Sequence, residues 1–498
     1  MSKPHDAPEA AAGGRAPLIG PAGAALALVV ALALCWPIWV TGAAFTSTDT
    51  RSYLRGGQTI WAVAGDVLFR AAPGPVGAPD GAAAGPVSPA GVVADEKGEA
   101  AVGRSLTYSA AAYALYAALG TPAIAVAQTW LTVFVALSLL TAQALRRPAP
   151  LLAGGLWLAL LTPLPFFAVY LAPDLLAAVP ILFAACLVWR WTSLTTAQKA
   201  VLTGLAALAA SSHYGTVPLA LGCVLGAMAL VALDGRTPRL GMIAAAVAVV
   251  GFGPVFNLGA SSATLDRASS APLRLPILLA RSIDDGPALW YLREHCPSAA
   301  LATCAVFDGD IPDNAGSFLW SNQGIADATP EEMAQVRDEE WAILAGAFLA
   351  YPAAQTSSLL RNAARQLVLV GLGGIVPEEG LDDRLQPVEA GPAAESGRAL
   401  RDRFGGLVPW GTWGAILASG AVAALARPGW REALAVLAAV GGLVVNAAIF
   451  GGLSAPVERY QARVIWVLPF VLLAVAAHAR AAPAAPGGAP ARPAGAAP

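Results

Sequence analysis

Long runs of apolar residues, separated by short polar loops, dominate the chain. Most of these runs approach or exceed the roughly 20 residues that an α-helix needs to cross a bilayer. The pattern predicts an all-α membrane protein with about ten transmembrane helices, at 21–45, 121–145, 150–172, 174–192, 199–213, 216–233, 240–258, 407–426, 431–452 and 460–478.

The placement of arginine and lysine predicts the orientation of these helices. Short cytoplasmic loops carry an excess of both residues, and the short loops on one side of the predicted bundle are all basic: ALRRPAP, WRWTSLTTAQK, DGRTPR and ARPGWRE. With this side inside the cell, both termini are cytoplasmic, which agrees with an even number of helices. The first apolar run exceeds the core of about 7 to 15 residues found in signal peptides, so we interpret it as an uncleaved first transmembrane helix.

The predicted helices divide the chain into five parts. We expect a disordered cytoplasmic N-terminus at 1–20, transmembrane helices one to seven at 21–258 with a large extracytoplasmic loop at 45–120, a late extracytoplasmic region at 259–406, helices eight to ten at 407–479, and a disordered cytoplasmic tail at 480–498. In the first loop, interfacial helices flank a Gly/Pro/Ala stretch at 73–103. In the late region, an amphipathic segment at 331–369 is expected to lie against the membrane and the bundle.

The composition of the chain supports this class and excludes others. Of the 498 residues, 57% are hydrophobic and 12% are charged, about half of the roughly 25% charged residues typical of soluble domains. A net charge of -2 and the lack of a basic run argue against a nucleic-acid partner. No P-loop, GxSxG or HExxH motif occurs, and GLGGIVPEEG is interpreted as a turn at a membrane edge.

Two of the five cysteines fall in the late extracytoplasmic region. Cys296 and Cys304 lie eight residues apart in an oxidising compartment, which predicts a local disulfide. A metal site that includes His295 is the rival interpretation, but no further His or Cys is available outside to complete a ligand set. The other three cysteines fall within apolar runs and are expected to be small buried residues: Cys35, Cys186 and Cys223.

The charged and polar residues at membrane edges gather on the predicted outer side. Because a charge inside the hydrocarbon region is costly, such residues are functional candidates. They mark the outer ends of helices one, three, five and ten, and we expect their loops to surround one cavity: Asp49, Arg51, Tyr53, Asp174, His213, Glu458, Arg459 and Arg463.

Each candidate also has a simpler structural interpretation. Asp174 follows Pro173 and could cap a helix, and Asp49 could cap the interfacial helix that follows it. His213 could bond a loop carbonyl. The charged residues that begin the last helix could form a solvated helix end. The sequence leaves these alternatives open.

The candidate residues suit the chemistry of a lipid-linked phosphate. Arginine binds phosphate oxygens bidentately and keeps its charge, so Arg459, Arg463 and Arg51 are candidate phosphate ligands. A carboxylate such as Asp49 could act as general base on an acceptor hydroxyl. Together they suit the transfer of a group from a lipid-linked donor.

This layout resembles the GT-C superfamily of integral membrane glycosyltransferases. The resemblance is carried by a first transmembrane helix, an outer loop with an acidic residue directly after it (TSTDTRSY), and interfacial helices before the second span, over residues 21–260. It implies a polyprenyl-phosphate-linked sugar donor and a catalytic Asp49. Many relatives carry paired acidic residues where this chain has one, so a divalent metal is possible and no metal ligand is assigned.

The expected function is therefore transfer of a sugar from a polyprenyl-phosphate-linked donor to an acceptor at the periplasmic face of a bacterial inner membrane. The expected partners are the lipid-linked donor and membrane lipids. A transporter or flippase is an alternative, but it favours an internal repeat and charges near the bilayer midplane, and neither is found. An envelope assembly protein that binds a partner through its acidic outer region is the other alternative.

Overall fold

The computed structural model describes residues 18–481 apart from 70–103, 265–274 and the short gaps at 143, 147, 297, 299, 322–323, 376, 378–379, 382–384, 386 and 389–390. The Gly/Pro/Ala stretch at 73–103 lies outside the described residues. So does nearly all of the two termini for which the sequence predicts disorder, 1–20 and 480–498.

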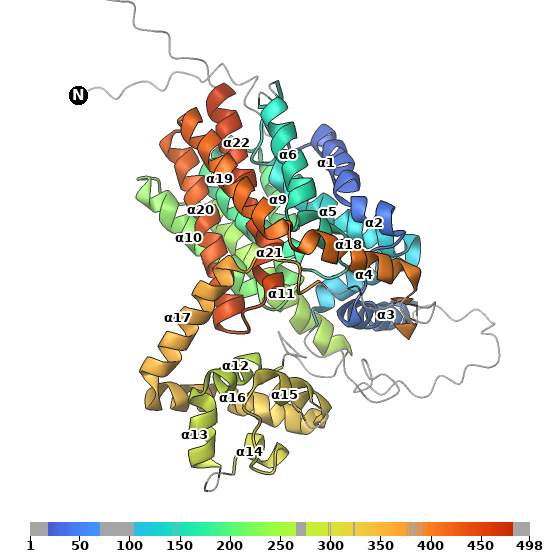
Figure 1. Ribbon diagram of the computed structural model, residues 1–498, viewed down its shortest axis with the longest axis vertical. Helices are drawn as coiled ribbons and strands as arrows, with labels where there is room; N and C mark the ends of the chain where they lie inside the picture. Colours follow the sequence, from blue (N-terminus) through green and yellow to red (C-terminus); the bar gives the residue numbers. More distant parts are fainter. Residues whose placement is uncertain are drawn as a thin grey trace, which may run out of the picture.

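The described chain is almost entirely helical and forms a bundle with a smaller domain appended to one end (Figure 1). The first half of the bundle contains α1 (Pro21–Leu34), α2 (Trp36–Thr41), α3 (Thr48–Phe69), α4 (Leu106–Leu119), α5 (Thr121–Leu137), η2 (Ala144–Arg146), α6 (Ala149–Leu161), α7 (Leu164–Val169), η3 (Leu175–Ala177), α8 (Ala178–Trp189), η4 (Trp191–Ser193), α9 (Thr196–Ser211), α10 (Thr216–Leu233) and α11 (Leu240–Thr264).

The rest of the chain builds the appended domain and returns to the bundle. The appended domain (residues 275–351) contains α12 (Ile277–Asp285), α13 (Pro287–His295), α14 (Ala302–Val306), α15 (Ala315–Trp320), η5 (Ile325–Asp327) and α16 (Pro330–Ala350). It is followed by α17 (Pro352–Val368), the antiparallel pair β1 (Gly380–Leu381) and β2 (Pro387–Val388), α18 (Pro392–Gly405), α19 (Val408–Ala426), α20 (Trp430–Asn446), the π-helix η6 (Ala447–Gly452), α21 (Glu458–Ile465) and α22 (Val467–Ala481).

Helix α8 is the centre of the bundle. Its sequence, AVPILFAACLVW, is apolar on every side, and every residue in it is buried. A helix that is hydrophobic all round is stable only inside a core. Helices α5, α9, α10, α20 and α22 pack around it, so α8 fixes the frame on which the surrounding loops are placed.

Five helical segments are long and apolar enough to cross a membrane by length and composition: Thr216–Leu233, Leu240–Ser262, Val408–Ala426, Trp430–Gly452 and Glu458–Arg480. A sixth is counted if α16 and α17, which are bent by 108° at their junction, act as one broken span. Shorter apolar helices accompany them at Pro21–Leu34, Leu106–Leu119, Thr121–Leu137, Ala149–Leu161 and Leu175–Trp189. The helices indicate a membrane protein.

Several of the ten predicted spans are not continuous α-helices. The apolar run at 21–45 is divided at Cys35 into α1 and α2, because Pro37 has no N–H to donate to the carbonyl one turn back. The run at 150–172 is divided at Thr162 and Pro163 into α6 and α7. The hydropathy pattern predicts how long the apolar segment is, whereas the prolines determine where the helix within that segment ends.

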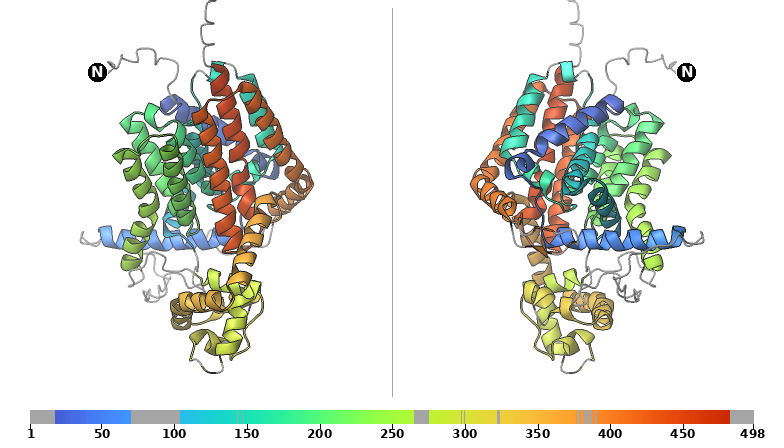
Figure 2. Two further views of the ribbon diagram at one scale, coloured as in Figure 1. Left: turned by 90° about the vertical axis from the view of Figure 1, so that its left-hand side faces the viewer. Right: turned by 90° about the vertical axis from the view of Figure 1, so that its right-hand side faces the viewer.

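Helix α3 lies across the end of the bundle, roughly perpendicular to the long helices α20 and α22 (Figure 2). Helix α4 packs against it, with Ser109 and Tyr113 approaching Gly57 so closely that a Cβ there would be 2.1 Å from the Ser109 carbonyl oxygen. The two segments predicted to be interfacial helices therefore form one layer. This layer begins with Asp49 and carries the first residues of the candidate site.

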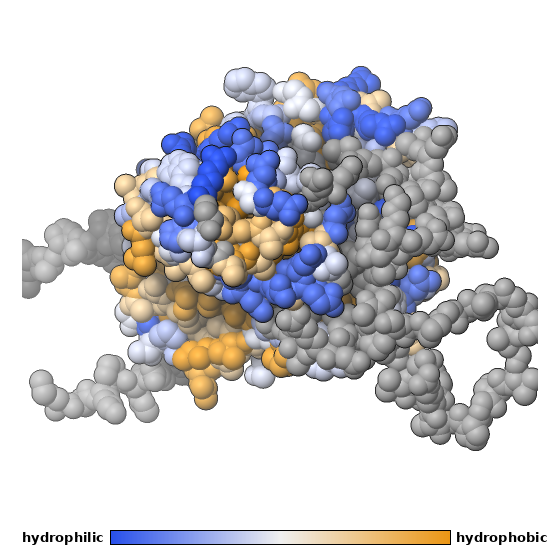
Figure 3. All heavy atoms as spheres, turned by 90° about the horizontal axis from the view of Figure 1, so that it is seen from below, coloured by the Kyte–Doolittle hydropathy of each residue, from blue (hydrophilic) through white to orange (hydrophobic). Residues whose placement is uncertain are grey.

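The appended domain has its own hydrophobic core, built around Leu279, Leu292, Phe318 and Val336. Seen from the end that carries this domain, the molecule presents hydrophilic side chains with apolar patches between them (Figure 3). The amphipathic segment predicted at 331–369 is two helices, α16 and α17, of which α16 belongs to this domain and α17 leads back to the bundle (Figure 1).

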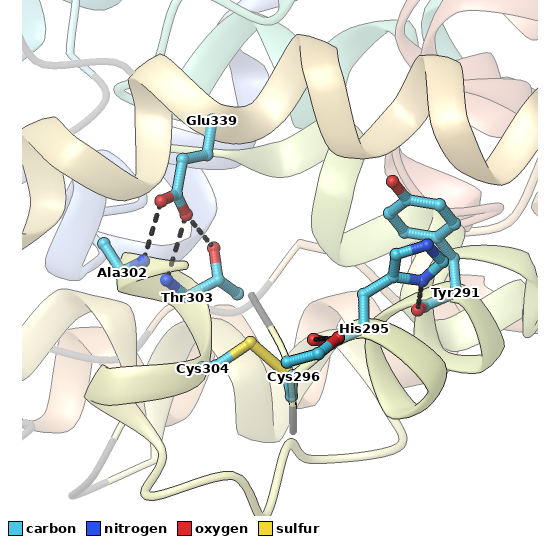
Figure 4. Close-up of a disulfide and its surroundings, with 8 residues drawn as sticks. Tyr291, His295, Cys296, Ala302, Thr303, Cys304 and Glu339 are labelled. Carbon is cyan, nitrogen blue, oxygen red and sulfur yellow. Dashed lines mark hydrogen bonds between the residues drawn. A yellow bond between two sulfur atoms is a disulfide. The ribbon is translucent and has the colours of Figure 1, made fainter. Parts of the chain in front are cut away.

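The predicted disulfide is present in the appended domain. Cys296 and Cys304 are bonded, and they join the end of α13 to α14 (Figure 4). His295 stacks on Tyr291 and its Nδ1 lies 2.8 Å from the Tyr291 carbonyl oxygen, so the rival metal interpretation of this segment does not hold. From α16, Glu339 accepts hydrogen bonds from the first amides of α14, which ties the loop to the domain.

The disulfide gives a direct test of this arrangement. After denaturation without a reductant, we expect maleimide to label three cysteines, because Cys35, Cys186 and Cys223 are free, and to label all five after reduction. Replacing both Cys296 and Cys304 by serine should destabilise the appended domain by about 2–3 kcal/mol, because the bond closes a short loop. Mass spectrometry counts the labels and limited proteolysis measures the destabilisation. Labelling of all five cysteines without reduction would contradict the pairing.

Candidate functional site

A β-bridge places Asp49 beside the loop that carries Asp174. The Phe45 amide donates to the Val169 carbonyl, and the Leu171 amide donates to the Phe45 carbonyl, both at 2.9 Å. Thr50 strengthens this link, because its hydroxyl donates to the Leu171 carbonyl at 2.9 Å. The start of α3 is therefore held against the turn that follows α7, although more than 120 residues separate the two segments.

Asp49 and Asp174 meet two arginines of α21. Arg459 binds Asp174 bidentately, with Nε 2.9 Å from Oδ1 and Nη2 2.7 Å from Oδ2. Its remaining nitrogen, Nη1, donates to Asp49 Oδ2 at 3.1 Å. Arg463, one turn further along α21, donates from Nη1 to Asp174 Oδ1 at 3.1 Å. One guanidinium from the C-terminal part of the chain thus bridges two carboxylates from the first half.

A third arginine completes the group. Arg104, just before α4, donates from Nη2 to Asp49 Oδ1. We call these five side chains, Asp49, Arg104, Asp174, Arg459 and Arg463, the arginine–carboxylate cluster. Three guanidinium groups face two carboxylates, so the cluster carries one excess positive charge.

The cluster runs from the surface into the protein. The side chains of Asp49, Arg104 and Arg459 are 22%, 21% and 23% exposed, whereas those of Asp174 and Arg463 are 3% and 2% exposed. Within the described part of the chain, Nε and Nη2 of Arg463 are buried and have no hydrogen-bond partner. Because a buried N–H group without an acceptor is costly, the inner end of the cluster has an unused capacity to bind an acceptor.

Aromatic rings flank all three guanidinium groups. Arg459 lies 4.9 Å from the ring centre of Tyr170, and Arg463 lies 4.0 Å from that of Phe450. Arg104 lies 5.5 Å from the ring centre of Tyr53. Such contacts stabilise a cation by about 0.5–2 kcal/mol and fix the plane of the guanidinium. Phe450 belongs to the π-helix η6, a type of helix that is often found at functional sites.

The ring of Tyr53 packs against Arg104 on the buried side of the cluster and is only 2% exposed. It makes an edge-to-face contact with Tyr108 at 4.8 Å, and the Tyr108 hydroxyl donates to Gln128 Oε1 at 3.2 Å. Gln128 Nε2 in turn donates to backbone carbonyls of the α7 segment, including that of Tyr170 at 2.8 Å. Tyr53 therefore lies between Arg104 and Tyr108, and the substrate contact that the sequence predicts for it stays a prediction.

His213 lies near the cluster without bonding to it. It sits in the turn between α9 and α10, where its Nδ1 accepts a hydrogen bond from the Gly215 amide at 3.0 Å. Its ring contacts Phe450 at 5.9 Å between centroids, on the ring that also covers Arg463.

Two predicted site residues do not join the cluster. Glu458 faces the loop after α17, where its Oε2 accepts a hydrogen bond from the Gly373 amide at 2.6 Å. The side chain of Arg51 makes no ion pair or hydrogen bond with any described residue. On α21 the helical rotation turns Glu458 to a different face from Arg459, and on α3 Arg51 lies two positions after Asp49, also on a different face.

The structure decides between the alternatives that the sequence leaves open. Asp174 makes no capping hydrogen bond with its side chain and binds two arginines in its place. Arg463 is nearly fully buried, so the start of the last helix is not a solvated end. Asp49 pairs with Arg104 and Arg459, and His213 bonds a loop amide, whereas the simple interpretation expects a carbonyl.

Arg104 is the residue that the sequence analysis missed. It ends a long Gly/Pro/Ala stretch and directly precedes Ser105, whose side chain caps α4. An isolated arginine next to a helix N-cap, at the edge of a segment predicted to be interfacial, was the available signal. Phe450 and Tyr170 gave no signal, because an aromatic residue in an apolar run is indistinguishable from core.

The described residues offer no metal centre. No group of three or more His, Cys, Asp or Glu side chains in the described part of the chain is close enough to hold a metal ion. The two carboxylates of the cluster, Asp49 and Asp174, are turned toward guanidinium groups, and cationic neighbours disfavour a divalent cation. The donor set does not fit a divalent metal, so we derive no step through one.

No protein-family model, curated protein or solved structure matches this chain. The functional assignment therefore depends on the chemistry of the arginine–carboxylate cluster.

Proposed function

We propose that the chain is a membrane glycosyltransferase of GT-C type, which moves a sugar from a polyprenyl-phosphate-linked donor to an acceptor at the periplasmic face. The observation that carries this proposal is that Arg459 joins Asp49 to Asp174 in one partly exposed cluster with an excess positive charge. A phosphodiester has one negative charge and two free oxygens, which match a guanidinium group with unused N–H donors.

In this proposal the arginines bind the phosphate of the donor, and Asp49 is the general base for the acceptor hydroxyl. A phosphate that approaches the exposed edge meets Arg104 and Arg459 first, and it competes with the carboxylate for their N–H groups. As the guanidinium groups turn to the phosphate, Asp49 is released to accept the proton of an acceptor hydroxyl. The acceptor oxygen then forms a bond to the anomeric carbon of the sugar while the bond from that carbon to the phosphate oxygen breaks, and polyprenyl phosphate leaves with its charge held by the arginines. Asp174, which is buried and bound bidentately, keeps Arg459 oriented throughout.

The proposal includes a membrane topology. We propose ten crossings with both termini in the cytoplasm of a bacterial inner membrane, the shorter and broken helices completing the count. The basic loops between α8 and α9 and between α10 and α11 then lie in the cytoplasm. The cluster lies at the opposite end, beside α3 and the appended domain. Membrane lipids and the lipid-linked donor are the proposed partners, and no nucleic acid is involved.

A partner-binding assembly protein is the second candidate. The observation that favours it is the exposure of two tryptophans on the appended domain, Trp320 at 57% and Trp341 at 64%. Exposed tryptophans are enriched at protein interfaces. This reading leaves the buried arginine–carboxylate cluster without a role, which is why we place it second.

Deletion of the gene in the native host tests the proposal. We expect the deletion strain to lose one sugar or one glycan from its surface profile and the wild-type gene to restore it. An unchanged profile in the deletion strain would contradict glycosyl transfer and favour the partner-binding candidate.

A further inference from the structure

Helix α17 buries a polar face, which is the reverse of an ordinary amphipathic helix. Its buried residues are all polar and recur at helical spacing: Gln355, Ser358, Asn362 and Gln366. On the other side, Leu360 is 67% exposed. A helix normally turns its apolar stripe to the core, and each polar group that is buried needs a partner. The partners of three of them, Gln355, Asn362 and Gln366, show what the helix connects.

We call these four residues of α17 the buried polar stripe. The first half of the buried polar stripe is bonded to the appended domain. Gln355 accepts a hydrogen bond from the Ser282 hydroxyl of α12 at 2.7 Å. Asn362 Nδ2 lies 3.0 Å from both carboxylate oxygens of Asp285, at the end of the same helix. Arg281 also pairs with Asp285, at 2.7 Å. Helix α12 and helix α17 are therefore joined through several directed bonds.

The second half of the stripe is bonded to the segment that precedes α21. Gln366 Nε2 donates to the Val457 carbonyl at 2.8 Å, and the Val457 amide donates to Gln366 Oε1 at 2.9 Å. One side chain thus holds both backbone groups of one residue. The close approach of α17 to η6 requires a glycine at position 451, because a Cβ on Gly451 would lie 2.3 Å from the Gln366 Cβ.

The loop after α17 continues this support onto α21 itself. Gly373 donates to Glu458, as described above, and a Cβ at Gly374 would lie 2.5 Å from the Cβ of Arg459. Arg459 is the second residue of α21 and follows Val457 by two positions. The position of the arginine that bridges both carboxylates is therefore set by α17 and the loop that follows it.

We propose that α17 is a strut in which Gln366 is a positioning residue for Arg459 and Arg463, and that the buried polar stripe ties their placement to that of the appended domain. The bonds fix the helix in one register, since a shift of one turn would leave several buried polar groups without partners. The consequence for phosphate binding rests on the proposed function, whereas the mechanical coupling does not.

Hydrogen exchange on the full chain in lipid nanodiscs tests the strut. The Gln366→Leu variant keeps the size of the side chain but loses both bonds, so exchange of the Val457 amide should rise about tenfold. The Gln366→Glu variant keeps the acceptor for that amide but loses the donor to the Val457 carbonyl, so its exchange should lie between those of wild type and Gln366→Leu. The Leu360→Ala variant, on the exposed side of the same helix, is the matched control and should leave the exchange unchanged.

A second variant tests the coupling to the appended domain. The Asn362→Leu variant cuts the link to Asp285, and we expect faster exchange both at the end of α12 and at Val457. Unchanged Val457 exchange in Gln366→Leu would overturn the strut, and a change confined to α12 in Asn362→Leu would overturn the coupling. Binding of undecaprenyl phosphate to the same nanodiscs separates the two proposals: faster exchange with unchanged binding keeps the strut and rejects the phosphate-binding role of the arginines.

Discussion

The Asp49→Asn variant should accumulate in the membrane and yet leave the host without the glycan that the deletion strain lacks. Asparagine has the same shape and still offers an oxygen to Arg104 or Arg459, so the cluster should remain assembled. It cannot take a proton from an acceptor hydroxyl. Loss of a general base costs typically about 10²–10⁴ in rate, which is enough to remove the product from a surface profile.

The measurement compares surface glycans of the parent, the deletion strain and the point mutant, with the amount of protein determined by blotting. The Arg239→Gln variant is the matched control, because Arg239 is exposed in the loop before α11, outside the arginine–carboxylate cluster. It should keep the parental profile. An intact profile in Asp49→Asn, with a defect only in the deletion, would remove Asp49 from the chemistry.

The Asp174→Ala variant should lose most of its folded population. Asp174 is 3% exposed and, within the described part of the chain, is the only acidic side chain that pairs with Arg463, which is 2% exposed. Removing the carboxylate leaves one buried guanidinium without a counter-charge and another with only the partly exposed Asp49. Breaking a buried ion pair in this way costs about 3–5 kcal/mol, a large part of the roughly 5–15 kcal/mol that stabilises a typical protein.

Thermal unfolding in detergent measures the loss, and an exposed ion pair provides the control. Asp402 pairs with Arg401 and is 66% exposed, so Asp402→Ala should change the stability by less than about 1 kcal/mol. In the double variant Asp174→Asn with Arg463→Gln, part of the lost stability should return, because neither charge is then buried alone. Equal stability of Asp174→Ala and wild type would show that the buried pairing does not form.

The principal members of the site were predictable because burying a charge is expensive. Asp49, Asp174, Arg459 and Arg463 stand out in an apolar chain, and the fold brings these four side chains into contact. The direction of each side chain was not predictable. Glu458 is adjacent to Arg459 in the sequence, yet the close approach of Gly371 and Gly373 turns it toward a loop.

The elements that bring the charges together carry weaker signals. The bridge between Phe45 and Tyr170 is made by backbone groups. Every residue has these groups, so the identity of the residues does not predict the bridge. The break of the first helix could be inferred from Pro37, whereas the register of α17 depends on amide side chains whose partners are far away in the sequence. Gln366 and Val457 are 91 residues apart. Hydropathy therefore predicts the apolar helices, and the tertiary structure decides how their ends meet.

Binding of a lipid phosphate to the purified chain tests the central claim most directly. Native mass spectrometry of nanodiscs that contain undecaprenyl phosphate should show a bound lipid on the wild type and on Asp49→Asn. Binding to Arg459→Gln should be weaker by at least about tenfold, the effect of losing a charged hydrogen bond. The Arg239→Gln variant, which removes an exposed arginine in the loop before α11, should bind as the wild type does. Equal binding by Arg459→Gln and Arg239→Gln would contradict the assignment of the cluster as a phosphate site.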